Sequence, residues 1–374
     1  MNLLKRIPSA TYITLVLIAM VFGTYLYNMT VPSLMNENIY LRGVFPVIRK
    51  AYDSTLGYLP FPFVYLLFMI LLSLIIGGFY DFFLSIKRRK YWGFVRRMIN
   101  VSCIIYVMFY WSWAMNYKNR SLSKQLNLIP VSIDSTMVYE EAMAIMRLLK
   151  PLRDSISLDT MALSDTLFNK EIENELRTSM VRLFRRWYLP YEGRVRVREL
   201  HPKGILLHIA TSGVYIPFAF EGHVDAGVPR IQFPFTMAHE MSHGYGITDE
   251  GECNFIGILV CANTDDLYIQ YSGLLAYWRY LANSLIRTAP TLALKALNER
   301  SPSINNDIIL IRTTLNQYKD YIPNMRDLIY DSYLKSHGVK AGIGSYSQVV
   351  TLMQEWKKSF HNRELYERLY IKKQ

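Results

Sequence analysis

The sequence predicts an α+β protein that is mainly helical and has two parts, a membrane anchor in residues 1–115 and a globular domain in residues 116–374. Three observations predict this class. Long apolar runs occur only in the first third of the chain, most of the remainder has apolar residues at helical spacing, and one segment near the middle alternates as strands do. A chain of 374 residues is long enough for one large or two smaller domains.

Three apolar runs, at about 10–27, 63–86 and 98–115, predict transmembrane helices because a bilayer span needs about 20 residues. A secretory signal peptide is the alternative for the first run, since Lys5 and Arg6 precede it. No small-x-small cleavage site follows, so we favour an uncleaved helix.

The third run is shorter than the second and contains the polar residues Asn100 and Ser102. A buried helix of a soluble core is the alternative there. Trp and Tyr residues near its end are typical of an interfacial aromatic belt.

The formal net charge of +12 is concentrated near the N-terminus. Residues 1–114 hold 11 Lys/Arg and 3 Asp/Glu, and the remaining 260 residues hold 31 and 27. The basic excess therefore lies between apolar runs, which indicates membrane topology and argues against a nucleic-acid surface.

The charges also predict an orientation. Lys87–Lys90, Arg96 and Arg97 separate the second and third runs without an acidic residue, so this loop is expected in the cytoplasm. With three spans, everything after about Asn116 then lies outside the cytoplasmic (inner) membrane, in the periplasm of a bacterium with two membranes. If the third run does not span, the globular domain is cytoplasmic instead.

The globular part begins with helices and continues with a small sheet. Residues 132–188 predict two or three amphipathic helices, with Asp134 and Asp159 as N-caps. Alternating apolar residues in 194–233 predict strands, among them Val195, Val197, Ile205, Leu207, Ile209, Val214, Ile216, Phe218, Ile231 and Phe233. Within this segment, 221–227 is a candidate edge strand to which an extended peptide adds, and a simple packing layer is the alternative.

A short helix is predicted next, beginning at Pro234 and ending at Gly244 and Gly246. Further helices are expected at about 250–262, 266–287, 290–299, 303–321, 324–337 and 345–359. The three cysteines are too few for a disulfide framework.

The predicted helix contains His239-Glu240-Met241-Ser242-His243, an HExxH sequence. Two histidines four residues apart lie on one face of a helix, so both imidazoles can bind one metal ion. Glu240 is then expected beside a zinc-activated water as general base, passing the proton on to the leaving amine. We therefore expect Zn²⁺, with His239 and His243 as ligands.

A catalytic zinc site needs a third protein ligand. Glu250 is the preferred candidate, because it should fall in the first turn of the next helix. The run from Glu250 to Asn254 also resembles the Glu-x-x-x-Asp arrangement of gluzincins, although those sites usually have Asp where this chain has Asn254. Asn254 would then lie one turn later and orient His239 or His243. Asp249 fits the spacing of metzincins, although no Met-turn is evident, and Glu252 is the third candidate.

The group that stabilises the oxyanion is not determined by the sequence. Tyr330, Tyr333 and Tyr346 downstream and His223 upstream are candidates, and a structural role is the alternative for each.

The chain resembles the bacterial family known as domain of unknown function 3810. The resemblance includes the three apolar runs and Trp113–Arg120, and it continues through Pro217-Phe218, Pro234–Phe255, Tyr271–Gly273, Tyr330–Lys335 and Ser345-Tyr346. Cys253 departs from the alanine typical of the family. The resemblance implies a membrane-anchored zincin-like protein related to metallopeptidases, and it implies no substrate.

The expected function is that of a membrane-anchored, zinc-dependent metallopeptidase acting on a peptide or protein. One alternative is a zinc amidase acting on cell-envelope material. The other is a catalytically silent metal-binding sensor or scaffold, against which the intact Glu240 argues.

Overall fold

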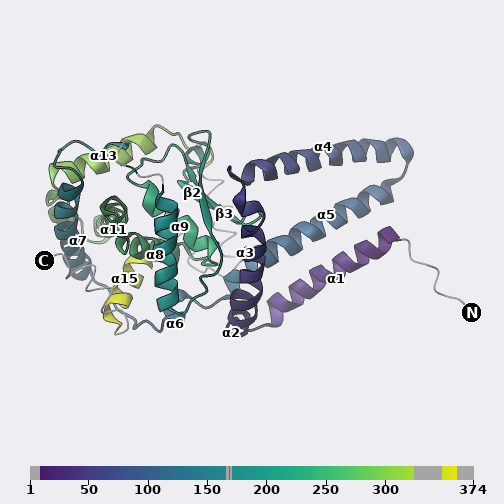
Figure 1. Cartoon of the computed structure of the whole chain (residues 1–374), viewed down its shortest axis with the longest axis horizontal. Helices are drawn as coiled ribbons and strands as arrows, with labels where there is room; N and C mark the ends of the chain where they lie inside the picture. The colour runs from purple at the N-terminus through teal and green to yellow at the C-terminus, as the bar shows by residue number, and fades with distance from the viewer. Residues whose placement is uncertain (1–8, 166–167, 169–170, 324–347, 360–374) are drawn as a thin grey trace, which may run out of the picture. The chain divides into compact units, whose positions relative to one another are not determined.

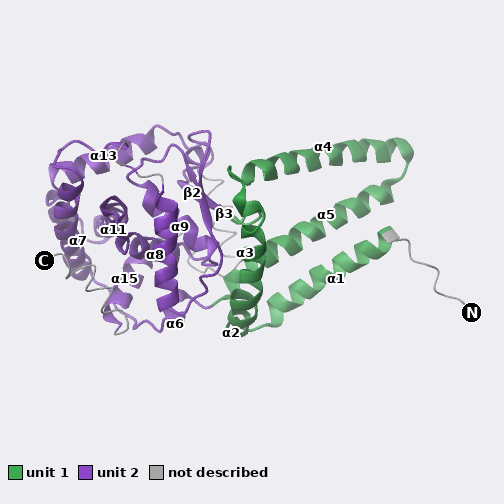
Figure 2. Cartoon of the chain, in the orientation of Figure 1, with its two compact units in different colours: residues 1–119, 216–220 green, residues 120–215, 221–374 purple. Residues whose placement is uncertain are grey.

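The computed structural model describes residues 9–165, 168, 171–323 and 348–359. The described chain is mainly helical, with one three-stranded sheet. It forms two compact units (Figure 2), unit 1 with residues 1–119 and 216–220, and unit 2 with residues 120–215 and 221–374. We describe each unit by itself.

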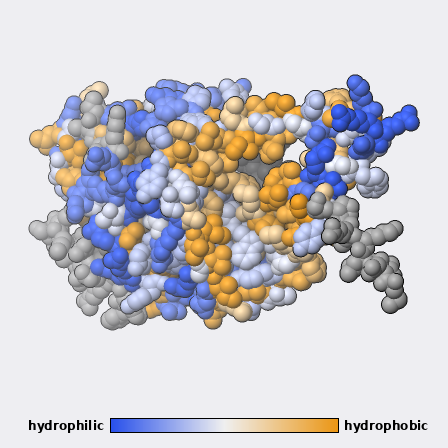
Figure 3. Space-filling view, turned by 45° about the vertical axis from the view of Figure 1, so that its right-hand side comes forward, coloured by the Kyte–Doolittle hydropathy of each residue, from blue (hydrophilic) through white to orange (hydrophobic). Residues whose placement is uncertain are grey.

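Unit 1 contains three helices long and apolar enough to cross a membrane, and they overlap the three predicted apolar runs (Figure 1). They are α1 (Ser9–Thr30), α4 (Val64–Arg88) and α5 (Tyr91–Ser112). Their large apolar side chains face outward, as a lipid environment requires. Figure 3 shows hydrophobic side chains along these helices and a hydrophilic cluster where α4 meets α5.

The predicted start of the third span was wrong, because α5 begins at Tyr91 and not near Met98. Only Arg89 and Lys90 separate α4 from α5, so Arg96 and Arg97 lie inside the helix. Arg97 Nε lies 2.8 Å from Asp81 Oδ2 on α4. Long basic side chains can extend from a helix end toward water, so their presence does not end the helix.

Between α1 and α4 the chain forms α2 (Ser33–Asn36), the π-helical η1 (Glu37–Val44), α3 (Phe45–Asp53) and the 3-10 turn η2 (Leu56–Tyr58). A second 3-10 turn, η3 (Ala114–Lys118), follows α5. The core of unit 1 consists of Tyr40, Leu41, Phe45, Tyr52, Phe63, Met115, Ala219 and Phe220.

Residues 216–220 belong to this core although the chain on both sides of them belongs to unit 2. Arg49 Nη1 donates a 2.7 Å hydrogen bond to the Phe220 carbonyl oxygen. The Tyr52 and Phe220 rings stack with their centroids 5.3 Å apart. Both contacts are buried, so this short loop is an integral part of unit 1.

Unit 2 is a helical assembly around α11 (Leu267–Thr288), which packs against helices that precede and follow it in the chain. Its other helices are α6 (Leu122–Gln125), α7 (Ser135–Ile156), α8 (Ile172–Arg186), α9 (Phe233–Gly244), α10 (Glu250–Ala262), α12 (Pro290–Asn298), α13 (Pro302–Asn316) and α15 (Gln348–Lys358). The predicted helix 324–337 lies outside the described residues.

Two predicted N-caps had different outcomes. Asp134 caps α7, because its carboxylate accepts hydrogen bonds from the amides of Thr136 and Met137. Asp159 begins no helix, and its carboxylate accepts a 2.9 Å bond from the Met161 amide within a loop. An aspartate satisfies its own local backbone as readily in a turn as at a helix start, so the second prediction was wrong.

The sheet contains β1 (Arg196–Leu200), β2 (Gly213–Ile216) and β3 (Glu221–Asp225), in the order β1-β3-β2 with β1 and β3 parallel. The prediction that 221–227 forms an edge was therefore wrong, since β3 is the middle strand. Its charged residues are buried because they are paired, as in the 2.8 Å bond from Arg198 Nε to Glu221 Oε1.

Two apolar stretches predicted as strands have other structures. Residues 205–209 contain the 3-10 turn η5 (Leu207–Ile209), and Ile231 and Phe233 lie at the entry to α9. The Asp225 carboxylate accepts hydrogen bonds from the amides of Gly204, Leu206 and Leu207. These amides are therefore not available to a strand ladder.

Candidate metal centre

The HExxH sequence lies on α9, a helix with every residue buried. Pro234 stands in the first turn, where its missing N–H costs no helical hydrogen bond. The next amide, that of Phe235, donates a 3.2 Å bond to Ser272 Oγ on α11. His239 and His243 follow one turn apart, so the helix geometry directs both imidazoles to one side.

Helix α10 supplies the third group. Gly246 adopts a φ of +93° in the turn after α9, a conformation that favours glycine. The chain then re-enters a helix at Glu250, and Asp249 caps that helix by accepting a 3.0 Å bond from the Glu252 amide. This tight connection brings the first residue of α10 opposite the histidines.

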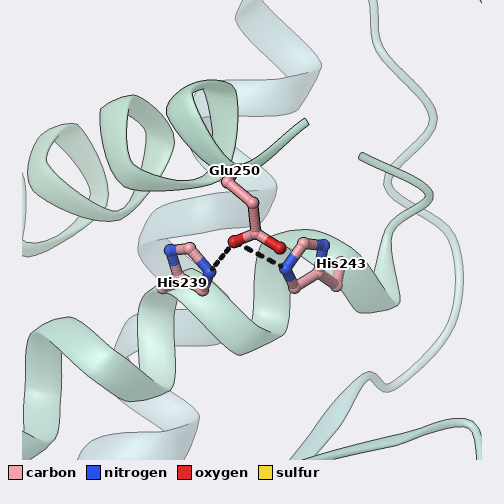
Figure 4. A group of neighbouring side chains, drawn as sticks. All are labelled: His239, His243 and Glu250. Carbon is pink, nitrogen blue, oxygen red and sulfur yellow. Dashed lines mark ion pairs between the residues drawn. The ribbon is translucent and has the colours of Figure 1, made fainter. Parts of the chain in front are cut away.

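The three side chains converge on one point (Figure 4). Glu250 Oε2 lies 3.0 Å from His239 Nε2 and 3.6 Å from His243 Nε2. The ligand atoms of His239, His243 and Glu250 all lie within 4.8 Å of one another, and all three residues are buried. Two imidazoles and one carboxylate match the donor set of catalytic zinc sites, which leaves a fourth position for water or substrate.

Both histidines are oriented through their other ring nitrogen. Asn254 Oδ1 lies 2.9 Å from His239 Nδ1, and the Ile247 carbonyl oxygen lies 2.8 Å from His243 Nδ1. Each acceptor favours a proton on Nδ1, the tautomer in which Nε2 carries the lone pair that would bind a metal. The residues present therefore fit a metal ion, and Asn254 lies where the sequence predicted an orienting group. Cys253 Sγ also contacts His243 Nδ1, at 3.3 Å.

We expect Asn254→Ala to lower the affinity for Zn²⁺ by about 10–100-fold, because His239 loses the acceptor that fixes its tautomer and ring orientation. Competition with a chromophoric chelator measures this affinity. Asn263→Ala, at the C-terminal end of the same helix, is the matched control and should retain wild-type affinity. Equal affinities for all three proteins would contradict the orienting role.

The two competing candidates for the third ligand lie outside the cluster. Asp249 is the cap of α10. Glu252 Oε1 accepts a 2.5 Å hydrogen bond from the Leu122 amide. Burial, together with the Asp249 charge, raises the pKa of Glu252 to about 8, so this carboxyl is largely protonated at neutral pH.

Charges in the centre separate the roles of Glu250 and Glu240. Burial opposes ionisation of Glu250, but the imidazoles of His243 and His239 outweigh it and hold its pKa well below the ordinary value. For Glu240 burial dominates and raises the pKa to about 7, although both imidazoles lower it. Glu250 is thus an ionised carboxylate, and Glu240 can gain and lose a proton near neutral pH.

The Glu240 side chain is 4% exposed. Its Oε2 atom is buried and has no hydrogen-bond partner among the described residues. A buried carboxylate oxygen without a partner is costly, which is typical of a functional group. It is free to accept a proton without first breaking another bond.

Of the predicted oxyanion candidates, His223 does not face the metal centre. A Cβ atom added to Gly222 would lie 2.7 Å from Glu240 Cβ, so this face of β3 is directed toward α9. Alternate residues point to opposite faces, and His223 therefore points away. Tyr330, Tyr333 and Tyr346 lie outside the described residues.

Tyr215 is a residue of this region that sequence reasoning missed. It lies on β2, is 7% exposed, and its ring centroid is 6.4 Å from that of His243. Gly213 and Tyr215 are two residues apart and share one face of the strand. That spacing was readable in the sequence, but only the fold shows that this face borders α9.

Comparison with known proteins identifies one relationship. A family model described as "Protein of unknown function (DUF3810)" matches residues 40–354. No curated protein and no solved structure matches the chain.

Proposed function

The chain belongs to the DUF3810 family, whose description states no activity, and from the metal centre we propose that it is a membrane-anchored, zinc-dependent metallopeptidase. One observation carries the proposal. His239, His243 and Glu250 converge from two helices, while the adjacent Glu240 carboxylate is buried with a free oxygen. Three ligands and a base are the parts that zinc-dependent hydrolysis of an amide requires.

The residues divide the chemistry as follows. His239, His243 and Glu250 would hold Zn²⁺, which when bound acts as a Lewis acid on water and on the substrate carbonyl. Glu240 accepts the proton of the attacking water as the water oxygen bonds to the carbonyl carbon. It then donates that proton to the amine nitrogen as the C–N bond breaks. A pKa of about 7 suits both steps, because the group must be a base first and an acid afterwards.

The sheet supports a peptide as the substrate. Among the described residues β2 is an edge strand, and Gly213 at its start lies against the Glu240 carboxylate. An exposed edge can pair with an extended backbone, which presents the scissile bond in a fixed register. A peptide therefore fits this site better than an amide without an extended backbone.

The membrane helices supply the proposed location. Lys87–Lys90 lie where α4 meets α5, and they favour the cytoplasmic side for that turn. With three spans, unit 2 then lies outside the cytoplasmic membrane, in the periplasm of a bacterium with two membranes. Substrates would be peptides or proteins of the cell envelope.

Glu240→Gln in the full-length chain tests the proposal. We expect the purified variant to bind one Zn²⁺ per chain, as wild type does, and to lose about 10²–10⁴-fold in peptide hydrolysis because the amide cannot accept the proton. Zinc is measured by elemental analysis, and cleavage by mass spectrometry on a diverse peptide library. Glu252→Gln is the matched control, since Glu252 is another buried carboxyl that lies outside the cluster, and it should keep both properties.

Other outcomes separate the alternatives. A wild type that binds zinc but cleaves no peptide would contradict the peptidase proposal and favour a silent sensor or an amidase acting on envelope material. A wild type without stoichiometric zinc would exclude all three.

A further inference from the structure

Two glycines lie against Glu240, one on each of two neighbouring strands. A Cβ atom added to Gly213 would lie 2.6 Å from Glu240 Oε1 and 2.9 Å from its Cγ. A Cβ atom on Gly222 would lie 2.7 Å from Glu240 Cβ. Non-bonded carbon atoms are most stable about 3.5–4.0 Å apart, so neither position accepts a side chain while Glu240 stays in place.

Backbone conformation does not explain these glycines. The positive-φ glycines of the described chain are Gly193, Gly204 and Gly246, and neither Gly213 nor Gly222 is among them. An alanine could adopt either backbone conformation. The methyl group of an alanine at either position would instead overlap the Glu240 side chain.

The two contacts lie at different points along the Glu240 side chain. Gly222 packs against its base at Cβ, and Gly213 packs against Cγ and the carboxylate. The strands therefore restrict both the χ1 rotamer and the direction of the carboxylate. Since Glu240 Oε2 has no hydrogen-bond partner among the described residues, this packing replaces the hydrogen bonds that usually orient a buried carboxylate.

We propose that Gly213 and Gly222 are positioning residues that hold Glu240 by close packing alone, so that its oxygens remain available to the reaction. A carboxylate oriented by donors has to share its lone pairs with them, which lowers its basicity. A carboxylate oriented by packing keeps its lone pairs for the proton it transfers. The inference rests on the proposed role of Glu240 as general base.

Glycine-to-alanine variants of the full-length chain test the inference. We expect Gly213→Ala and Gly222→Ala to keep stoichiometric Zn²⁺ and to lower kcat by about 10²-fold, with a smaller change in KM, because the base is displaced by a fraction of a bond length or more. Gly227→Ala is the matched control. Its Cβ would lie 2.5 Å from Tyr318 Oη, an equally tight contact that does not involve Glu240. Its kcat should stay within 2–3-fold of wild type.

A second measurement does not depend on activity. Thermal unfolding is recorded for Gly213→Ala and Gly222→Ala in the wild type and in Glu240→Ala, which lacks Cγ and the carboxylate but keeps Cβ. Gly213→Ala should lower Tm less in Glu240→Ala than in wild type, and the residual loss reflects the His223 carbonyl oxygen 2.9 Å from the added Cβ. Gly222→Ala should lower Tm equally in both.

The outcomes are separable. Equal Tm losses for Gly213→Ala in both backgrounds, or an unchanged kcat in zinc-loaded Gly213→Ala, would overturn the inference. A wild type without peptidase activity would instead remove the proposed function, while the Tm comparison would still decide whether Gly213 confines Glu240.

Discussion

Replacing Asp307 by alanine is expected to lower the free energy of unfolding by about 3–5 kcal/mol, because it leaves a buried arginine without its counter-charge. Arg153 and Asp307 are both fully buried, and Arg153 Nε lies 2.7 Å from Asp307 Oδ2. That loss is a large fraction of the 5–15 kcal/mol that stabilises a typical domain. Chemical denaturation of the full-length protein, followed by tryptophan fluorescence, measures it.

The size of the effect follows from the number of elements that meet at Asp307. Its carboxylate accepts 2.8 Å and 2.7 Å hydrogen bonds from Tyr271 Oη on α11 and from the Leu163 amide. The Arg153 guanidinium also donates to the carbonyl oxygens of Ser157 and Met161. One carboxylate thus joins α7, α11, α13 and the loop after α7.

An exposed ion pair that also involves a residue of α7 is the control. Lys150 Nζ lies 3.6 Å from Glu299 Oε2, and both side chains are roughly half exposed. Glu299→Ala should therefore lower the free energy of unfolding by less than about 1 kcal/mol. The double variant Arg153→Met/Asp307→Leu should be more stable than Asp307→Ala, because it leaves no unpaired charge. Similar losses for Asp307→Ala and Glu299→Ala would contradict the interpretation.

Acidification is expected to destabilise the protein through His223, by about 2 kcal/mol between pH 7 and pH 5. Burial, together with the positive charge of Arg198, lowers the pKa of His223 to about 3. In the unfolded chain a histidine has a pKa of about 6.5. Between these values the unfolded state binds a proton that the folded state does not, so stability is full above pH 6.5 and falls as the pH decreases.

The surroundings of His223 explain why it stays neutral. Neither ring nitrogen has a hydrogen-bond partner among the described residues. Arg198 is its partner residue on β1. The acidic groups that share this face of β3 are engaged elsewhere, since Glu221 accepts from Arg198 and Asp225 accepts from backbone amides. Neither of these two carboxylates is therefore available to compensate a charge on the imidazole.

The measurement compares denaturation midpoints at pH 7 and pH 5 for wild type, His223→Gln and His201→Gln. Between pH 7 and pH 5 the free energy of unfolding should fall by about 2 kcal/mol less in His223→Gln than in wild type, because glutamine does not titrate. His201, with a side chain 62% exposed, is the control and its variant should behave as wild type does. Identical pH dependence in His223→Gln and wild type would contradict the prediction.

Features with a local cause were predictable from the sequence. The helical apolar pattern after Pro234 and the start of α10 at Glu250 were read correctly, because caps, prolines and glycines act on their immediate neighbours. The same reasoning found Asn254, since a helical turn separates it from Glu250. These predictions needed no knowledge of what packs against the segment.

Features with a distant cause were not predictable. The apolar alternation in 205–209 is typical of a strand. The Leu206 and Leu207 amides, however, donate hydrogen bonds to the Asp225 carboxylate, so they cannot pair with a neighbouring strand. Likewise, Glu221, His223 and Asp225 resemble the polar face of an edge strand, and only their burial beside Arg198 shows that β3 is central. Spacing alone could not separate Glu250 from Asp249, because both stand at the helix start. The cap bond of Asp249 separates them.

The loop 216–220 has a practical consequence for biochemical dissection. Its residues belong to unit 1, while the chain up to Tyr215 and from Glu221 onward belongs to unit 2, so the chain passes between the units three times. A truncation that starts near residue 120 would cut only the first passage. It would leave Phe220, the residue directly before β3, without its contacts to Arg49 and Tyr52. The absence of activity in such a fragment would therefore not contradict the proposed function, and assays should use the whole chain extracted from membranes.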